Sequence, residues 1–389
     1  MSSDEFDVCI IGGGIYGCGI AQAAAASGYR TLLLEKGAIA SGTSSQSTKL
    51  IHGGLRYLEH AHFGLVYEAL QERETLLSIA PELVTREWFY IPVYRDSRRP
   101  GWMIGCGLLL YFLLSGGRSR FRRLPRSRWE KMLPDLKNDG LVSVWAYQDA
   151  ATDDAKLTRA VAASARSFGC DIHEHTELVS AIADNNGWVV NMSDQSTLRA
   201  RVLVNAAGAW TNGIAGRIEP RPPTSKIRLV QGSHLMLDRE CPSYIYAESI
   251  DGRVMFFRPW RGKSLAGSTE TPFDGDPGKA CINGDEIRAI LATWNHYFPD
   301  HPCSEKDILE TFCGLRALPA ADGSAFAASR ETTIVTSNDP APYIAVYGGK
   351  LTTYRREAEK VIRALNSQLP GHHLADTRRI HLQSDNPVT

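Results

Sequence analysis

The sequence predicts an α/β protein of two domains, and three observations predict it. A strand, a glycine turn, a helix and a second strand follow one another over residues 6–35. Alternating strands separated by glycine turns occupy residues 228–271. Strand and helix character of the first kind then returns at residues 343–365. Because the first pattern is interrupted and later resumes, we expect a discontinuous domain with a parallel sheet and a second domain built on an antiparallel sheet.

Length and charge set the broad class. A chain of 389 residues exceeds what a single hydrophobic core usually organises, which agrees with two domains. Its 43 basic and 43 acidic residues cancel, so the chain as a whole gives no reason to expect a nucleic-acid partner. The eight cysteines are scattered, without the spacing of metal ligands, and we expect reduced thiols and no metal.

The first strand leads into a glycine-rich turn. Gly12, Gly14 and Gly17 follow the apolar segment 6–11 in the spacing G-x-G-x-x-G, and Glu35 ends the second strand. The glycines allow a tight turn, the approach of a pyrophosphate and close packing of helix on strand, while the acid can bind ribose hydroxyls. The pattern predicts a Rossmann-like dinucleotide site, although these residues alone leave NAD and FAD both open.

The later segments favour FAD. The dinucleotide fold resumes at residues 202–208 and again at 343–352, after a long antiparallel insertion, whereas an NAD domain normally continues with further βα units. The segment 348–353 would place a helix N-terminus against the flavin, where its dipole stabilises the anion formed on reduction. A well-capped terminal helix without a ligand would show the same residues.

Four further helices and a hairpin complete the predicted elements. Apolar residues recur at helical spacing over 65–80 and 285–298, and Asp153 and Asp154 offer caps for a helix that ends at Gly169. The apolar run 102–114 is shorter than the roughly 20 residues of a membrane-spanning helix. Residues 171–193 predict a hairpin that turns at Asn185-Asn186-Gly187.

A long motif gives the chain a recognisable likeness. The segment 44–59, read with the glycine turn and residues 348–354, resembles the FAD-dependent glycerol-3-phosphate dehydrogenases. The likeness extends to about residue 365 and includes Asp153-Asp154, Gly232-Ser233-His234, Gly314-Leu315-Arg316 and Arg330. It implies an amino-acid-oxidase-like flavoprotein that oxidises sn-glycerol 3-phosphate to dihydroxyacetone phosphate by hydride transfer to FAD and passes the electrons to a quinone.

The resemblance implies roles for particular side chains. A dianionic phosphate is held by arginine forks and lysine, and removal of the hydroxyl proton needs a base such as an imidazole. The expected substrate-binding residues are Arg56, Tyr57, Arg316 and Arg330, and the expected catalytic residues are His234, Lys350 and Arg316. Which of His234 and Lys350 takes the proton stays open.

The expected cofactor contacts come from five segments of the chain. They are Gly12, Gly14, Ile15 and Gly17; Glu35 and Lys36; Thr43, Ser44, Ser47, Lys49 and Leu50; Ala207 and Gly208; and Gly349, Lys350, Leu351 and Thr352. The expected domains are an FAD-binding domain of residues 1–80, 141–225 and 311–366, a substrate-binding cap of 81–140 and 226–310, and a C-terminal tail of 367–389.

Three features depart from the family pattern. Tyr16 stands in the glycine turn where the family commonly has Asn, and Gln231 stands where it has Lys, which removes a cation near the expected pocket. Typical bacterial members also continue into a helical C-terminal domain that these 389 residues lack.

The apolar run 102–114 is flanked by arginines. They are Arg98, Arg99, Arg118, Arg120, Arg122, Arg123, Arg126 and Arg128. A basic collar around an apolar helix suits an anionic membrane surface, each charge contributing ~1 kcal/mol. We therefore expect a cytoplasmic protein with peripheral membrane contact through residues 102–128, against the alternative of a packed helix with a solvated basic loop; a homodimer is left open.

Two other functions remain compatible with the sequence. One is an FAD-dependent oxidase or dehydrogenase of another small hydroxy acid or amino acid, suggested by Gln231. The other is a flavin-binding protein without catalysis. Reduction of the bound flavin by glycerol 3-phosphate separates these alternatives from the expected activity.

Overall fold

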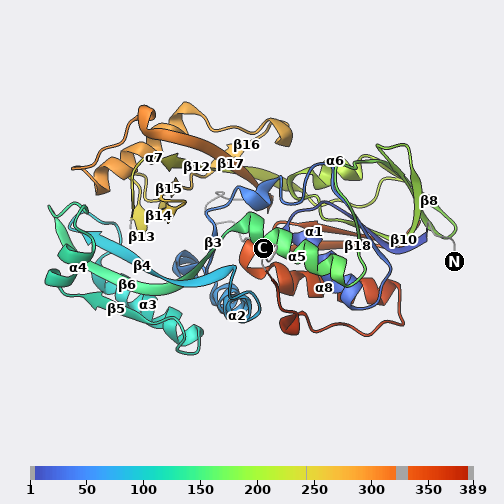
Figure 1. Ribbon diagram of the computed structural model, residues 1–389, viewed down its shortest axis with the longest axis horizontal. Coiled ribbons are helices and arrows are strands. Elements are labelled where there is room, and N and C mark those ends of the chain that lie inside the picture. The colour runs from blue at the N-terminus through green and yellow to red at the C-terminus, as the bar shows by residue number, and fades with distance from the viewer. Residues whose placement is uncertain (1–4, 242, 321–331, 384–389) are drawn as a thin grey trace, which may run out of the picture.

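The computed structural model describes residues 5–241, 243–320 and 332–383. Within them the chain forms two large sheets, which lie in the two halves of the molecule (Figure 1). Segments from the start and the end of the chain share one half with residues 154–219, and residues 84–152 and 227–319 form most of the other. The expected α/β architecture with a discontinuous first domain is confirmed.

The first sheet has nine strands and a parallel centre. β1 pairs in parallel with β2 on one side and with β10 on the other, and β10 also pairs in parallel with β19. The strands of this sheet are β1 (Glu5–Ile11), β2 (Thr31–Leu34), β7 (Asp171–His173), β8 (Leu178–Asp184), β9 (Gly187–Met192), β10 (Thr197–Asn205), β11 (Ile218–Glu219), β18 (Thr333–Ser337) and β19 (Tyr343–Tyr347). Segments that are far apart in sequence therefore form one sheet, which explains the interrupted sequence pattern.

Both faces of this sheet are buried. Val8 and Ile10 of β1 face the cluster formed with helices α1 (Ile15–Ala26), α5 (Asp154–Ser167) and α8 (Tyr354–Gln368), whereas Cys9 and Ile11 face the opposite cluster. A central parallel strand covered on both sides is apolar at nearly every position, which is why residues 6–11 are. Asp153 accepts a hydrogen bond from the backbone of Lys156 and caps α5 as expected.

The second sheet has ten strands and is mostly antiparallel. Its strands are β3 (Leu50–Ile51), β4 (Val84–Tyr94), β5 (Phe121–Leu124), β6 (Leu141–Thr152), β12 (Ile227–Leu237), β13 (Tyr244–Glu248), β14 (Val254–Trp260), β15 (Lys263–Gly267), β16 (Thr271–Phe273) and β17 (Ile308–Pro319). Helices α2 (Phe63–Ile79) and α3 (Gly101–Leu114) pack on one face of this sheet. Helices α4 (Arg126–Met132) and α7 (Gly284–Tyr297) pack on its other face. A short helix, α6 (Thr211–Ala215), follows β10.

Three strands belong to a different sheet from the one that the expected boundaries imply, and the shortest of them is β3, which pairs with β6 in the second sheet. β6 (141–152) pairs with β4 along its length, and β17 (308–319) pairs with β12, so both lie in the second sheet. The boundaries at 141 and 311 had assigned them to the first domain. An apolar strand has the same appearance in either sheet, because sequence pattern identifies a strand but not its hydrogen-bonded neighbour.

Candidate active site

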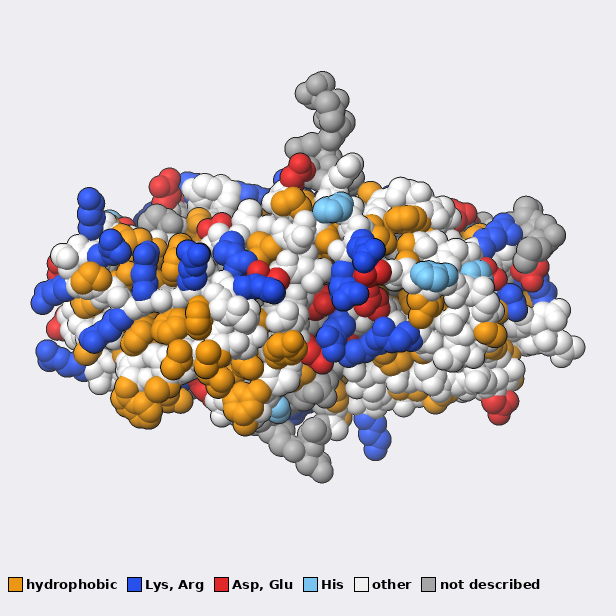
Figure 2. Space-filling model, turned by 90° about the horizontal axis from the view of Figure 1, so that it is seen from below, with side chains coloured by type: hydrophobic (Ala, Val, Ile, Leu, Met, Phe, Trp, Pro, Cys, Tyr) orange, Lys and Arg blue, Asp and Glu red, His pale blue; other side chains and the backbone are white. Residues whose placement is uncertain are grey.

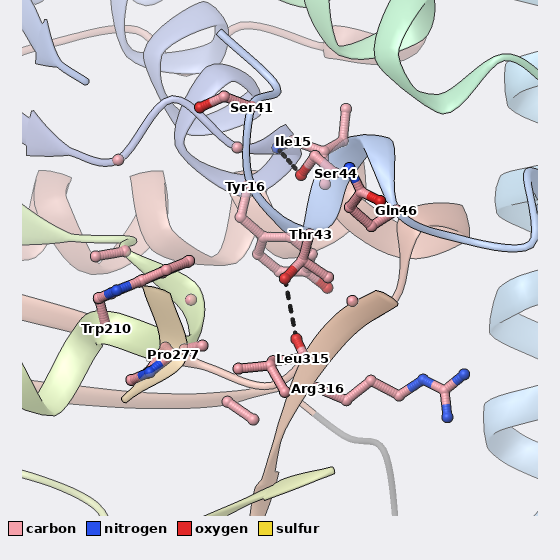
Figure 3. Close-up of a pocket in the computed structure, with 18 of the residues that line it drawn as sticks. Ile15, Tyr16, Ser41, Thr43, Ser44, Gln46, Trp210, Pro277, Leu315 and Arg316 are labelled. Carbon is pink, nitrogen blue, oxygen red and sulfur yellow. Dashed lines mark hydrogen bonds between the residues drawn. The ribbon is translucent and has the colours of Figure 1, made fainter. Parts of the chain in front are cut away.

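A cavity of about 1080 Å³ lies where the two sheets meet. Its wall combines the β1–α1 turn, the loop of residues 41–50, strand β17 and the segment 348–352 that precedes α8. Figure 3 shows residues of the β1–α1 turn, the 41–50 loop and β17 around one space. The site therefore exists only in the folded chain, with one wall from each domain.

The glycine turn forms the first wall. Gly12 has a φ of 110°, and a Cβ on it would lie 2.8 Å from the carbonyl oxygen of Ala206. A Cβ on Gly17 would lie 1.8 Å from the carbonyl oxygen of Gly12, so this glycine packs the turn and does not line the cavity. At Gly14 the nearest atom to such a Cβ is the Ser44 hydroxyl at 3.1 Å. Gly14 thus exposes backbone to the cavity, as the approach of a pyrophosphate requires.

The carboxylate at the end of β2 is positioned by backbone. Glu35 accepts hydrogen bonds from Gly13 N at 2.6 Å and Gly37 N at 2.8 Å, and it lines the cavity. The ammonium of Lys36 lies 4.1 Å from the centre of the Trp210 ring. A carboxylate in this place beside the glycine turn can accept a hydrogen bond from a ribose hydroxyl of a dinucleotide.

The loop of residues 41–50 joins the two domains. Thr43 Oγ1 donates to the carbonyl oxygen of Leu315 at 3.0 Å, and Ser44 Oγ accepts from Ile15 N at 2.9 Å, as Figure 3 shows. Asp154 anchors the same loop: it accepts from the Ser47 hydroxyl at 2.6 Å and from Lys49 Nζ at 2.6 Å.

Lys49 is therefore held in an ion pair away from the cavity wall, while Ser47 and Leu50 line the cavity. The anchoring role of Asp154 was not foreseen, because the sequence indicates a helix cap there and nothing about the loop that it binds.

Strands β12 and β17 form the opposite wall. Gly232 and Gly314 are directly paired across the two strands. A Cβ on Gly314 would lie 2.9 Å from the carbonyl oxygen of Gln46, and one on Gly232 would lie 2.7 Å from Nη2 of Arg316. Gly314 therefore lets β17 approach the loop of residues 41–50, and Gly232 leaves space for the guanidinium of Arg316.

A cluster of charged side chains surrounds this guanidinium. Arg316 donates to Glu270 at 3.3 Å and to the Ser268 hydroxyl at 2.8 Å, and Arg56 donates to the same Glu270 oxygen at 3.4 Å. Each of the three charged side chains is at most a quarter exposed. Glu270 thus bridges two arginines that are 260 residues apart in the sequence. No spacing in the sequence indicates this acid.

Lys350 lies close to the expected substrate residue Tyr57. Its ammonium is 3.9 Å from the centre of the Tyr57 ring, and both residues line the cavity. The neighbouring Thr352 is buried and accepts a hydrogen bond from His52 N at 3.1 Å. His52 also lines the cavity, so it brings to the wall an imidazole that sequence reasoning did not select.

His234 lies behind the wall. The side chain is 1% exposed and stacks on Phe312 with ring centres 4.9 Å apart. Its Nε2 is 2.9 Å from Oγ1 of Thr48, a residue that does line the cavity. Burial, the charge of Arg316 and that of Lys49 hold the pKa of His234 well below its usual value. The imidazole is therefore neutral and meets the cavity through Thr48.

Gln231 does not face the cavity. Its side-chain amide donates to Glu286 of α7 at 2.7 Å and to the carbonyl oxygen of Cys281 at 2.9 Å. The substitution that had been expected to remove a cation near the pocket therefore lies on the α7 side of β12, where Gln231 is 3% exposed. It does not alter the charge of the cavity wall itself.

The structure brings most of the expected site residues together. The expected residues that line the cavity are Gly12, Gly14, Ile15, Glu35, Lys36, Thr43, Ser44, Ser47, Leu50, Tyr57, Ala207, Gly208, Arg316, Gly349, Lys350, Leu351 and Thr352. Gly17, Lys49, Arg56 and His234 lie next to that wall but do not line it. Arg330 lies outside the described residues.

Comparison with known proteins gives the class of this site. Residues 7–355 match the sequence pattern of the FAD-dependent oxidoreductase family, which spans both domains. The protein is therefore an FAD-dependent oxidoreductase, and FAD is its cofactor. The residues present fit that cofactor, because a backbone cradle at Gly14 and an acid at Glu35 border a single cavity that runs on to the segment 348–352.

Closer relatives narrow the family. The chain is 40% identical over 374 residues to a glycerol-3-phosphate dehydrogenase of Pseudomonas tolaasii, covering 93% of this chain and 72% of that protein. It is 38% identical to the aerobic glycerol-3-phosphate dehydrogenase of Escherichia coli and 35% identical to a D-erythritol 1-phosphate dehydrogenase of Brucella abortus, covering 94% of this chain and 74% of each relative. The chain belongs to the family of FAD-dependent glycerol-3-phosphate dehydrogenases.

Solved structures agree with the fold. The glycerol-3-phosphate dehydrogenase of Bacillus halodurans, solved with FAD, superposes with a TM-score of 0.77 at 28% identity and covers 98% of this chain and 68% of that one. Glycine oxidase of Geobacillus kaustophilus superposes with a TM-score of 0.72 at 20% identity, covering 98% and 99% of the two chains, and shows the shared fold alone. In the described part of the chain, no helix has both the length and the apolar character to cross a membrane.

Proposed function

We propose that the protein oxidises sn-glycerol 3-phosphate to dihydroxyacetone phosphate. The observation that carries this proposal is a pair of arginines: Arg316 lines a cavity built for FAD, and Glu270 joins it to Arg56 next to that wall. Lys350 lines the same cavity. A phosphate dianion in a partly dry pocket needs such a set of donors. The curated relatives that act on glycerol 3-phosphate share up to 40% of the aligned residues, which supports the substrate.

In the proposed reaction each residue has a separate task. Arg316 and Arg56 bind the phosphate, and Lys350 adds a third positive charge. Bound FAD supplies the hydride acceptor for the secondary alcohol carbon. The hydroxyl proton passes to Thr48 while Thr48 gives its own proton to Nε2 of His234, across the 2.9 Å contact. Lys350 and His52 are the competing acceptors, because both line the cavity.

Anaerobic titration of the FAD-loaded protein tests the substrate. Glycerol 3-phosphate is expected to bleach the flavin absorbance stoichiometrically, whereas glycerol, lactate and glycine leave it unchanged. D-erythritol 1-phosphate belongs in the same series, because a relative at 35% identity carries that activity. Absence of bleaching at millimolar glycerol 3-phosphate would refute the proposal. Bleaching by D-erythritol 1-phosphate alone would show that the longer polyol phosphate is the substrate.

We further propose a quinone as the electron acceptor and a docking face for an anionic membrane. Helix α3 exposes Trp102, Leu109 and Leu113, which are 72%, 50% and 62% exposed. Exposed arginines follow it in β5, in α4 and in the loop before β5: Arg118, Arg120, Arg122, Arg123, Arg126 and Arg128. Figure 2 shows a broad apolar area beside a row of basic side chains in this half of the molecule. An apolar face with a basic rim suits the cytoplasmic surface of a membrane.

Vesicle sedimentation tests the docking face. The FAD-loaded protein is expected to sediment with anionic vesicles at low salt, and Leu109→Ser with Leu113→Ser is expected to weaken binding about tenfold or more, through the lost apolar burial. Val179→Ser with Ile182→Ser is the matched control, because these side chains are 53% and 45% exposed and lie on β8, in the first sheet. Equal binding of the two double variants would remove the proposal. That the protein forms a homodimer stays a prediction, which sedimentation-velocity measurement of its mass would test.

A further inference from the structure

Tyr16 connects the two ends of the FAD-binding domain. It lies in the glycine turn at the start of the chain, and its side chain is part of the cavity wall (Figure 3). The phenol oxygen accepts a hydrogen bond from the backbone nitrogen of Lys350 at 3.0 Å. It also lies 3.2 Å from the hydroxyl of Thr332 and donates to the Lys350 carbonyl oxygen at 3.5 Å.

Gly349 is shaped to receive this phenol. Its φ is 99°, and a Cβ on it would lie 2.1 Å from the Tyr16 oxygen. The backbone angle favours glycine at 349 whatever residue stands at 16, and the contact requires glycine there as long as residue 16 is tyrosine. The two segments are 333 residues apart in sequence and fit each other closely.

Lys350 is held at both its backbone and its side chain. Its N–H points to Tyr16, while its ammonium lies over the ring of Tyr57. Two positions further on, Thr352 is bound to His52. The segment that precedes α8 is thus held at three points, each of them on the cavity wall. Burial raises the pKa of Tyr16 to about 12, so the phenol keeps its proton and can donate while it accepts.

We propose that Tyr16 is a positioning residue, which sets the place of the 348–352 segment, and with it the Lys350 ammonium, against the flavin. The proposal rests on the proposed function only where turnover is measured.

Tyr16→Phe is the direct test, because it removes the hydroxyl and keeps the ring. In the FAD-loaded protein we expect the flavin to be released about three- to tenfold faster, as followed by flavin fluorescence, because the hydrogen bonds between the phenol oxygen and the Lys350 backbone are lost. The visible spectrum of the bound flavin is expected to shift. With glycerol 3-phosphate we expect kcat to fall more than KM rises. Tyr67→Phe is the control, since this tyrosine is 50% exposed on α2.

A second pair of variants tests the fit with Gly349. Gly349→Ala in the natural chain is expected to lose flavin far faster than Gly349→Ala in a Tyr16→Asn background, because the shorter side chain removes the close contact. Equal release from both would overturn the proposal, as would natural release and spectrum in Tyr16→Phe. If glycerol 3-phosphate fails to reduce the flavin at all, the proposed function fails, and the release and spectral results still decide the role of Tyr16.

Discussion

The two walls of the cavity differ in how their residues are brought together. The glycine turn and Glu35 lie within 24 consecutive residues and are positioned by one strand, one turn and one helix. The wall of β12 and β17 brings Arg316 to Glu270 and to Arg56, from three separate segments. The first wall is a local motif, whereas the second exists only through strand pairing and domain contact.

This difference explains what each wall contributes. The local motif can be shared by many enzymes that bind the same cofactor, because its geometry depends on backbone alone. The assembled wall holds the charged side chains that we propose as the substrate-binding residues. Variants in the first wall should therefore affect folding and FAD binding together. Variants in the second wall should affect substrate binding and turnover, without a change in FAD binding.

The largest effect is expected at Gly17. Gly17→Ala places a methyl group 1.8 Å from the carbonyl oxygen of Gly12, so the turn must move. We expect about 3 kcal/mol or more of lost stability, together with loss of bound FAD. Gly107→Ala is the matched control: it is also a helical glycine, a Cβ there meets nothing within 4 Å, and it should gain about 0.5–1 kcal/mol. Urea unfolding and FAD stoichiometry give both values, and similar stability of the two variants would contradict the packing argument.

The second effect is expected at Arg316. Arg316→Gln removes charge-assisted hydrogen bonds to a phosphate, so kcat/KM for glycerol 3-phosphate should fall on the order of 10²- to 10³-fold. The amount and the affinity of bound FAD should stay near those of the natural chain. Arg126→Gln, on the exposed face of α4, is the control. Loss of FAD from Arg316→Gln would mean that the two walls are not separable.

The third effect concerns His234 and pH. Its folded-state pKa is lowered, so below about pH 6.5 the unfolded chain binds a proton that the folded chain excludes. Stability from this group is complete above that pH and falls by up to about 1.4 kcal/mol per unit as the pH drops towards the folded pKa. His234→Gln should lose less stability than the natural chain between pH 7.5 and 5, measured as urea midpoints. Parallel losses would show that the imidazole is charged in the folded protein.

The sequence was sufficient for the first wall and insufficient for the second. The β1–α1–β2 unit, the FAD motif and the return of the domain at β19 and α8 all follow from contiguous patterns. The sheet membership of β6 and β17 does not, because their hydrogen-bonded neighbours lie far away in sequence. Glu270 and Thr48 were missed for the same reason: each has a role only through a contact with a distant strand.

The smallest effect is expected at Gln231, where sequence and structure give opposite expectations. From the sequence alone, Gln231→Lys would restore a cation to the pocket and lower the KM for glycerol 3-phosphate. In the structure the side chain points at Glu286 on α7, so the new ammonium would form a buried ion pair there, with little net change in stability. We therefore expect KM within about twofold of the natural value, since Glu286 would neutralise the new charge on the α7 side of β12. Steady-state kinetics with glycerol 3-phosphate measure this, and a KM lowered about tenfold would mean that the influence of the second wall extends through the sheet to α7.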